Sequence, residues 1–457
     1  MRKLSLLVLP LLGFGLSAQA QWAQQPIGFA SRNSIPLYLD VVDASTVWTV
    51  SIQDGTYAAP QAARTTNGGQ TWTVITLPAL VANEEEVVAL SAVSATAAWV
   101  VTSINTVGPS GIAARILHTT DGGQTWVRQG GPAVFGSPDS YPGFIRFFSA
   151  TEGVAGGRNL TPNGPFELYT TANAGQTWTA VPTPPTATVA DENIVAATAL
   201  GNSAWFATSE GRVFRSVNKG VTWAVSQVPG GLSGYDGLAS LAFRDGQNGL
   251  FSLLDTGLST NHLLFATTNG GTTWAAVPYT GPLHGLGLSA VPGTSQYVST
   301  GLNIMEMGRS SNDQGSSYTR NNGLTWTALE SQIDHLRVEF VSPTAGYSGG
   351  FPLSATTPGG VNKFNSTVLG ARTDAALQAG LRLFPNPAVD GRLTLQAAQA
   401  VGPAQVRVLD AQGRVVSEQS WAGAAPLPLD LSRAAAGLYV LEVQAATGTA
   451  RQKLVLP

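Results

Sequence analysis

The sequence predicts an all-β protein, a β-propeller of about seven blades followed by a small carboxy-terminal β-sandwich. Three observations predict this fold. An octapeptide that closes with tryptophan recurs six times at intervals near 50 residues, a short apolar strand recurs seven times at a similar spacing, and both repeats stop before residue 381. The 457 residues include 52 Gly and 27 Pro, a composition that favours short strands joined by turns.

The first 20 residues have the pattern of a secretion signal. The basic pair Arg2-Lys3 precedes an apolar run from Leu4 to Leu16, and Ala18-Gln19-Ala20 provides a small-x-small cleavage site. An apolar run of about 13 residues, interrupted by Pro10, is shorter than the roughly 20 residues that a membrane-spanning helix needs. We therefore expect residues 1–20 to be a signal peptide, with no transmembrane segment in the mature chain.

The octapeptide predicts a tight turn. Its third residue, Asn or Asp, can accept hydrogen bonds from backbone N–H groups of its own turn, and the glycine two positions later permits positive φ. The closing tryptophan buries a large ring. We expect these to be residues of the fold and not of catalysis: Asn67, Gly69 and Trp72; Asp121, Gly123 and Trp126; Asn173, Gly175 and Trp178; Asn218, Gly220 and Trp223; Asn269, Gly271 and Trp274; Asn321, Gly323 and Trp326.

The second repeat is a strand that precedes each octapeptide and carries a large apolar anchor. The anchors recur at intervals of 45 to 55 residues, at Trp48, Trp99, Val154, Trp205, Leu250, Tyr297 and Tyr347. This repeat counts seven units, and we interpret Thr356 to Gly360 as an eroded seventh octapeptide. Each unit has room for four short strands, and a sheet of that size buries both faces only by stacking against others. We therefore expect residues 21–370 to form the propeller.

The pattern S/T-x-D/N-x-G-x-T-W resembles the Asp-box, also called the BNR repeat. Propellers with this repeat include sialidases, sortilin-type propellers, xyloglucan-active glycoside hydrolases and photosystem II assembly factor-like proteins. The resemblance covers about residues 30 to 370. It implies the fold but not the activity, because these families do unrelated things.

The last 77 residues, 381–457, follow a linker expected at residues 371–380 and lack the period near 50. They resemble the type IX secretion carboxy-terminal sorting domain of Gram-negative Bacteroidota. The matching motifs are F/Y-P-N-P, a D-x-x-G turn, G-L-Y and a terminal Lys-Leu-Val, which give as motif residues Pro385, Asn386, Pro387, Gly413, Gly437, Tyr439 and Lys453. The resemblance implies type IX secretion machinery as a partner, passage through the periplasm and across the outer membrane, and removal of this domain, often with attachment to surface lipopolysaccharide.

Charge and composition exclude several function classes. The formal net charge is -3 and charged residues make up 11% of the chain, so no basic face for nucleic acid is expected. Cysteine is absent, which excludes disulfides, thiolate metal sites and a cysteine nucleophile. The four histidines are separated by long intervals, so we expect neither a metal site nor a cofactor; they are His118, His262, His284 and His335.

The search for an enzyme active site gives no clear constellation. A sialidase needs three clamping arginines and an early F-R-I-P motif, and the string Phe144-Ile145-Arg146-Phe147 has the wrong order. We expect Arg64, Arg212 and Arg309 to be solvated strand ends. Another glycoside hydrolase needs two carboxylates roughly 5 to 10 Å apart. No pair stands out among the candidates Asp191, Glu192, Asp236, Asp245, Asp255 and Glu306.

Three further segments are candidates for the surface. Glu84 to Glu86 is expected to be a solvated loop between blades. Residues 311–318 mimic an additional octapeptide just before the sixth one, so we expect a longer loop there, with residues 305–318 as a candidate functional rim. Exposed aromatic residues for ligand binding are expected at Tyr141, Tyr235 and Tyr279.

Two functions follow as hypotheses. The favoured one is a non-enzymatic exported propeller whose loops bind a glycan or a protein. The alternative is a secreted glycoside hydrolase, sialidase-like or of another glycan-degrading type, with carboxylates converging at the mouth of the central channel. Two facing carboxylates in an aromatic-lined groove would favour the enzyme.

Overall fold

The computed structural model describes residues 21–29, 34–53, 60–78, 85–104, 114–137, 139–232, 238–254, 262–303, 312–352, 359–366, 369, 375–402, 404–410, 415–445 and 448–457. The expected signal peptide lies outside them. Within these ranges the chain is almost entirely strand, with a single 3-10 turn, η1 (Gly131–Ala133), and a single short helix, α1 (Ala375–Gly380). No helix in these ranges is long and apolar enough to span a membrane.

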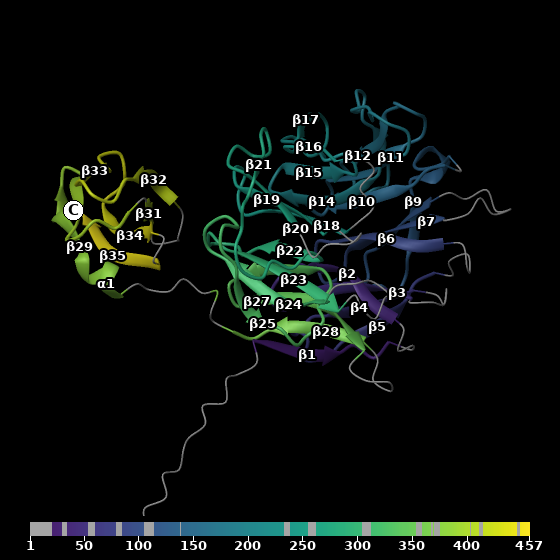
Figure 1. Ribbon diagram of the computed structural model, residues 1–457, viewed down its shortest axis with the longest axis horizontal. Helices are drawn as coiled ribbons and strands as arrows, with labels where there is room; N and C mark the ends of the chain where they lie inside the picture. Colours follow the sequence, from purple (N-terminus) through teal and green to yellow (C-terminus); the bar gives the residue numbers. More distant parts are fainter. Residues whose placement is uncertain are drawn as a thin grey trace, which may run out of the picture.

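Seven four-stranded antiparallel sheets make up residues 22–364, as predicted (Figure 1). Blade 1 contains β2 (Ser34–Val41), β3 (Val47–Gln53), β4 (Gln61–Thr65) and β5 (Thr73–Thr76); blade 2 contains β6 (Glu85–Ala92), β7 (Ala98–Ile104), β8 (Ala114–Thr119) and β9 (Val127–Gln129); and blade 3 contains β10 (Pro142–Phe147), β11 (Gly153–Asn159), β12 (Phe166–Thr171) and β13 (Thr179–Ala180). Blade 4 contains β14 (Ile194–Leu200), β15 (Ser203–Thr208), β16 (Arg212–Ser216) and β17 (Ala224–Gln227), and blade 5 contains β18 (Leu238–Phe243), β19 (Gly249–Leu254), β20 (His262–Thr267) and β21 (Ala275–Ala276). Blade 6 contains β22 (Gly287–Ala290), β23 (Tyr297–Asn303), β24 (Asn312–Thr319) and β25 (Thr327–Glu330), and blade 7 contains β26 (Val338–Ser342), β27 (Ala345–Pro352), β28 (Gly359–Phe364) and β1 (Trp22–Pro26).

The blades form a closed ring around their first strands. Each first strand contacts the first strand of the next blade, from β2 and β6 through to β22 and β26, and β26 contacts β2. The first strands therefore surround a central channel, and the fourth strands lie at the outside.

The amino-terminal strand completes the last blade. β1 pairs with β28 in antiparallel register, with Trp22 opposite Phe364, and Figure 1 shows the purple β1 beside the green β28. Blade 7 consequently has no hairpin between its third and fourth strands, which is where the other six blades carry the octapeptide. This explains why anchors number seven and octapeptides six.

The interpretation of Thr356 to Gly360 as an eroded octapeptide is wrong. Tyr347 pairs with Lys363 as Trp48 pairs with Arg64, so Phe364 occupies the position that Thr65 occupies in blade 1. The octapeptide position of blade 7 thus follows β28, whereas Gly359 and Gly360 begin that strand. Residues 356–358 lie outside the described residues.

The six octapeptide turns share one set of hydrogen bonds. In blade 3 the hydroxyl of Thr171 accepts the N–H of Gly175 at 2.9 Å, and Oδ1 of Asn173 accepts the N–H of Thr177 at 2.9 Å. The equivalent bonds recur in the other five copies at 2.8 to 3.1 Å. In blade 2 the acceptor is Asp121, and hydrogen bonds from the hydroxyl and N–H of Thr125 lower its pKa to about 2.

The turn glycines also allow neighbouring blades to approach. All six have φ between 81° and 90°. A Cβ atom on Gly123 would lie 2.8 Å from Ile75 of blade 1, and one on Gly220 would lie 2.6 Å from Val154 of blade 3. Glycine is therefore required at these positions both by the backbone angle and by the contact with the preceding blade.

The anchors join each blade to a neighbour. All seven are at most 1% exposed. Trp48 donates from Nε1 to the carbonyl of Ser94 in blade 2 at 2.9 Å, and Trp205 donates to Gly270 in blade 5 at 2.8 Å. Tyr347 of blade 7 donates from its hydroxyl to the carbonyl of Ala44 in blade 1 at 3.2 Å, across the junction where the ring closes. These bonds satisfy polar atoms that burial of the rings would otherwise leave unpaired.

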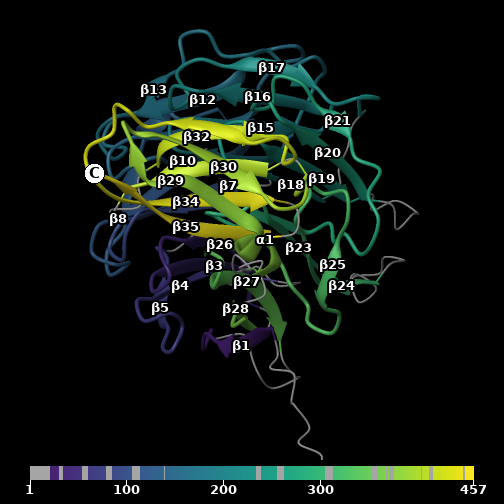
Figure 2. The same ribbon diagram turned by 90° about the vertical axis from the view of Figure 1, so that its left-hand side faces the viewer.

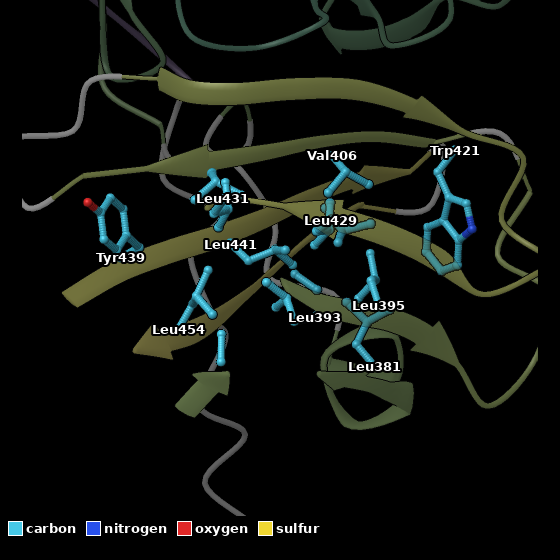
Figure 3. Close-up of a cluster of buried hydrophobic side chains, with 14 of the residues drawn as sticks. Leu381, Leu393, Leu395, Val406, Trp421, Leu429, Leu431, Tyr439, Leu441 and Leu454 are labelled. Atoms are coloured by element: carbon cyan, nitrogen blue, oxygen red, sulfur yellow. The ribbon is translucent and has the colours of Figure 1, made fainter. Parts of the chain in front are cut away.

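The carboxy-terminal part is a separate small β-sandwich, as predicted. One sheet contains β29 (Leu381–Val389), β30 (Arg392–Ala397) and β33 (Leu427–Asp430), and the other contains β31 (Ala404–Leu409), β32 (Val415–Trp421), β34 (Gly437–Ala445) and β35 (Gly448–Leu456). β34 and β35 lie side by side (Figure 2). Leucines of both sheets, among them Leu395 and Leu441, meet in one core (Figure 3).

The linker expected at residues 371–380 is shorter than predicted. Residues 371–374 lie outside the described residues, but residues 375–380 form α1, and Leu377 packs into the core of the sandwich. Gln378 Oε1 accepts the N–H of Arg451 on β35 at 2.7 Å. The carboxy-terminal domain therefore includes this helix.

The turn hydrogen bonds predict the effect of one substitution. Thr171→Val keeps the shape of the side chain but leaves the buried N–H of Gly175 without its acceptor, so we expect a loss of about 1–3 kcal/mol in the free energy of unfolding. Urea denaturation followed by tryptophan fluorescence measures this loss. Thr179→Val, at an exposed position on β13 of the same blade, is the matched control and should change stability by about 0.5 kcal/mol or less. Equal effects of the two substitutions would contradict the role assigned to the turn.

Candidate functional site

The central channel brings ionisable side chains of distant blades together. Tyr38 and Asp40 come from β2, Arg146 comes from β10, and Arg337 and Glu339 lie at and beside the start of β26. The channel also contains a cavity of about 50 Å³, lined by the first strands of blades 1 to 4 and by Arg337. None of the five was among the site residues predicted from the sequence, because only ring closure places them together.

The two channel carboxylates bind the backbone of the next blade. Glu339 Oε2 of blade 7 accepts the N–H of Val41 in blade 1 at 2.9 Å, and Asp40 Oδ2 of blade 1 accepts the N–H of Ala92 in blade 2 at 2.9 Å. The hydroxyl of Ser91 accepts the N–H of Phe147 in the same way at 3.0 Å, between blades 2 and 3. Three successive junctions therefore use one device, a side-chain oxygen that accepts a backbone N–H across the blade boundary.

Burial raises the pKa of both carboxyl groups. For Glu339 the pKa rises to about 8, because burial penalises the charge and the negative charge of Asp40 adds to the penalty. For Asp40 the pKa rises to about 6 through burial, against the opposing charge of Arg146. The pair consequently retains a proton at neutral pH, as interacting carboxyl groups do.

Two carboxyl groups with different pKa values are the pattern that glycoside hydrolysis requires, but the surroundings do not suit a sugar. Each carboxylate already accepts a backbone N–H of the ring itself. The cavity of about 50 Å³ is far smaller than the roughly 150 Å³ that accommodates even a benzene ring. Glu339 and Asp40 therefore have a structural role, in which each carboxylate holds its blade to the next one.

The histidines are less isolated than their sequence intervals predicted. His262 Nε2 and His284 Nδ1 lie 3.2 and 3.1 Å from the same oxygen, Oδ1 of Asp313, and Gly285 donates its N–H to Oδ2 at 2.8 Å. Burial alone would raise the pKa of Asp313, but the hydrogen bonds from both histidines hold the pKa below its ordinary value. Within the described ranges no group of three His, Cys, Asp or Glu residues has an arrangement that could hold a metal ion.

The expected loop at residues 305–318 is wrong over its second half. Residues 312–319 form β24, and Asp313 is buried at its start. Residues 305–311, including Glu306 and Arg309, lie outside the described residues. The remaining histidines are also packed into the fold: His118 stacks on Trp99 at 4.3 Å, and the buried His335 lies 2.9 Å from Glu330.

Buried ion pairs replace two of the expected solvated charges. Glu85 lies in β6 and pairs with Arg115 at 2.9 Å, and Glu192 pairs with Arg212 at 3.0 Å; both carboxylates are 0% exposed. The expectations of a solvated loop at Glu84 to Glu86 and of a solvated Arg212 are therefore wrong, with Glu84 outside the described residues. Arg64 is also engaged, since its guanidinium lies 5.4 Å above the ring of Trp48.

The other candidates are similarly occupied. Asp191 pairs with Arg158 at 3.5 Å, and Asp245 accepts the N–H groups of its own turn. Tyr141 is half-buried and donates to Glu86 at 3.3 Å, and Tyr279 packs against the core between blades 5 and 6, so neither is the exposed aromatic expected. Tyr235, Asp236 and Asp255 lie outside the described residues.

A groove of about 590 Å³ lies on the outside of the ring, where β9 of blade 2 meets the octapeptide turn of blade 3. Gln176 and Thr177 of the turn are exposed, as are Val127 and Arg128 of the strand, and half-buried Trp178 forms one wall. The sequence predicted the strand and the turn. It did not predict that the turn of one blade faces the outer strand of the preceding blade.

The sorting motifs meet at one edge of the sandwich. The side-chain amide of Asn386 donates to the carbonyl of Lys453 at 2.7 Å and accepts the N–H of Val455 at 3.1 Å, so the F/Y-P-N-P motif binds the last strand. The hydroxyl of Tyr439 donates to the carbonyl of Ala435 at 2.7 Å. Pro385 and Pro387 lie on β29 and Gly437 begins β34, whereas Gly413 lies outside the described residues.

The raised pKa of Glu339 predicts a pH dependence of stability. The folded protein holds this proton more tightly than the unfolded chain, so between the ordinary pKa of 4.5 and about 8 the free energy of unfolding falls as pH rises. Glu339→Gln still accepts the N–H of Val41 but does not ionise, so we expect its stability to be nearly constant between pH 6 and about 8.5. Urea denaturation across that range measures the slope.

The matched control is Glu152→Gln, which removes a surface carboxylate paired with Lys219. Because that pairing lowers the pKa of Glu152, its titration ends below pH 6 and the control should retain the slope of the unaltered protein. An unaltered protein with constant stability over the range, or a Glu339→Gln variant that keeps the slope, would contradict the assignment.

Comparison with known proteins agrees with this architecture. Residues 382–457 match the family model described as a secretion system C-terminal sorting domain. A search of curated proteins found no match. The structure is similar to that of YCF48 bound to D1 peptide, at 18% sequence identity and a TM-score of 0.50, covering 76% of this chain and 97% of that one.

Two further solved structures have the same kind of likeness. YCF48 from Cyanidioschyzon merolae has 17% identity and a TM-score of 0.50, covering 76% of this chain and 99% of that one. The GH74 enzyme of Niastella koreensis has 13% identity and a TM-score of 0.43, covering 93% of this chain and 66% of that one. At these identities the likeness shows the fold alone. The protein is therefore a β-propeller that ends in a type IX secretion sorting domain, exported through the periplasm to the cell surface or the medium.

Proposed function

We propose that this exported propeller is a non-enzymatic binding protein that recognises a glycan or a protein with the outer surface of its ring. The observation that carries the proposal is that the carboxylates already have partners within the fold. Every candidate carboxylate that the structure describes is engaged by the fold, either in an ion pair, in a turn or across a blade boundary. A hydrolase needs two such groups free to face a substrate.

The groove between blades 2 and 3 supports a binding role. Its size falls within the range of about 300–1,000 Å³ that is common for ligand sites. Its wall combines the aromatic ring of Trp178 with the amide of Gln176 and the hydroxyl of Thr177, a set that can stack on a sugar ring or peptide group and hydrogen-bond to it. The groove contains no carboxylate, so it can bind such a ligand without cleaving it.

A glycoside hydrolase is the second candidate function. The likeness to a GH74 enzyme is weaker than the likeness to YCF48, of which one structure is described as a peptide complex. Both comparisons concern the fold, so neither assigns a ligand to this chain. The engaged carboxylates and the small channel cavity favour binding over hydrolysis.

Incubation of the full chain with a panel of polysaccharides and sialylated glycans tests the two functions together. We expect no release of reducing sugar or sialic acid, and saturable binding to a member of that panel or of a peptide array by calorimetry or surface plasmon resonance. Gln176→Ala removes an exposed amide from the groove, and we expect it to weaken that binding by about tenfold. Gln247→Ala, at an exposed position on blade 5, is the matched control and should bind normally.

Turnover of a glycan that Glu339→Gln or Asp40→Asn abolishes would establish the hydrolase instead. Binding that survives Gln176→Ala unchanged would remove the groove from the proposal.

The carboxy-terminal domain predicts a change in localisation. Deletion of residues 375–457, which include α1, removes the domain that the secretion machinery reads, so we expect the propeller to accumulate in the periplasm. Fractionation and protease treatment of intact cells measure this, with the full-length chain as control. Normal surface display of the shortened chain would contradict a sorting role for the domain.

A further inference from the structure

The cavity in the central channel has an unusual charge lining. Arg146 and Arg337 both line it, together with Tyr38 and apolar residues of the first strands. Asp40 and Glu339 lie in the channel but not among the residues that line this cavity. Two arginines are therefore the charged residues that line the cavity, and no carboxylate lies in its wall.

The two arginines differ in how many N–H groups of the guanidinium have a hydrogen-bond acceptor in the protein. Arg146 donates from Nη1 to the carbonyls of Leu90 and Ile145 at 3.1 and 3.0 Å, and from Nη2 to the carbonyl of Ala197 at 3.4 Å. The backbone carbonyl of Arg337 accepts the N–H of Gly349 at 3.2 Å, but its guanidinium makes neither a hydrogen bond nor an ion pair with the described residues. Its guanidinium lies 5.9 Å from the centre of the Tyr38 ring, which offers no hydrogen-bond acceptor in the plane of the fork.

An unpaired guanidinium in this position is energetically costly. Burial lowers the pKa of Arg337, and the positive charge of Arg146 acts in the same direction. Arg337 is half-buried, and a cation that is partly removed from water is normally matched by an opposite charge or by several acceptors. Because Glu339 and Asp40 each accept a backbone N–H at a blade boundary and Glu86 accepts the hydroxyl of Tyr141, the described carboxylates of this region have other partners.

We propose that the channel cavity binds a small planar oxyanion, with the chemistry of a carboxylate, through a paired hydrogen bond from the guanidinium of Arg337 and the positive charge of Arg146. Planar two-oxygen anions match the fork of arginine geometrically. The volume of about 50 Å³ holds roughly three to five water-sized atoms at about 10–15 Å³ each. Acetate and bicarbonate have four non-hydrogen atoms, whereas a sugar ring or a peptide segment is too large.

The site is independent of the outer groove, and its ligand would tie blade 7 to blade 3 across the channel. Arg337 precedes β26 of blade 7 and Arg146 lies on β10 of blade 3. An anion between them would neutralise two like charges that otherwise repel. The ligand would thereby stabilise the ring and would not be a substrate.

Thermal unfolding of the full chain with sodium acetate, compared with sodium chloride at constant ionic strength, tests the proposal. We expect a saturable rise of the unfolding temperature with acetate, as binding to the folded state alone requires. Arg337→Gln should lose this rise while unfolding at a higher temperature than the unaltered protein in chloride, because a half-buried charge that is repelled by Arg146 is removed. Arg433→Gln, at an exposed position of the carboxy-terminal domain, is the matched control and should retain the acetate response.

Calorimetric titration with acetate provides the second measurement. Arg337→Lys keeps the charge but loses the planar fork, and we expect it to bind acetate about tenfold more weakly or worse; this variant carries the test if Arg337→Gln does not fold. The proposal is overturned if acetate and chloride act alike on the unaltered protein. It is also overturned if Arg337→Gln keeps the acetate response or loses stability in chloride like an ordinary structural residue.

Discussion

The pairing of β1 with β28 closes the ring, and the rest of the propeller depends on it. Trp22 on β1 is 1% exposed, donates to the hydroxyl of Ser316 in blade 6 at 2.9 Å, and packs against Phe340 and Phe364. Without this strand blade 7 would keep three strands, and the backbone groups at the outer edge of β28 would lose their partners. Because residues near both ends of the propeller must fold together, the ring is stabilised as one unit and not blade by blade.

Closure of the ring also creates the central channel and brings its charged side chains together. Glu339 and Asp40 are 299 residues apart in the sequence, yet they act at adjacent blade boundaries, each accepting one backbone N–H of the following blade. The carboxylates are therefore used for cohesion, and their pKa values rise because the ring that they hold together also buries them. Arg146 and Arg337 line a cavity of about 50 Å³, which is the site proposed for a small anion.

This division of labour is the reason why we propose a binding role for the outer surface of the ring. The interior of the ring engages the described acidic residues in ion pairs and turns, and its cavity is too small for a sugar or a peptide. The outer groove, in contrast, forms where the turn of one blade approaches the last strand of the preceding one. Gln129 and Trp178 in its wall join blades 2 and 3, but Arg128 and Gln176 are exposed and their side chains make no hydrogen bond with the described residues. A propeller can change such residues without losing its blade contacts, which is how one fold supports many ligands.

Local pattern alone determined the strands, the turns, the number of blades and the carboxy-terminal sandwich, because each octapeptide and each anchor repeats a short-range requirement. A positive φ at Gly175, an N–H acceptor at Thr171 and a buried ring at Trp205 follow from the residues themselves. The tertiary structure decided which charges meet. His262, His284 and Asp313 converge where blades 5 and 6 meet, and Glu85 and Arg115 pair across the strands of blade 2. Asp40 and Glu339 act at adjacent boundaries because the first and last blades are neighbours in the ring, and no spacing in the sequence specifies any of these contacts.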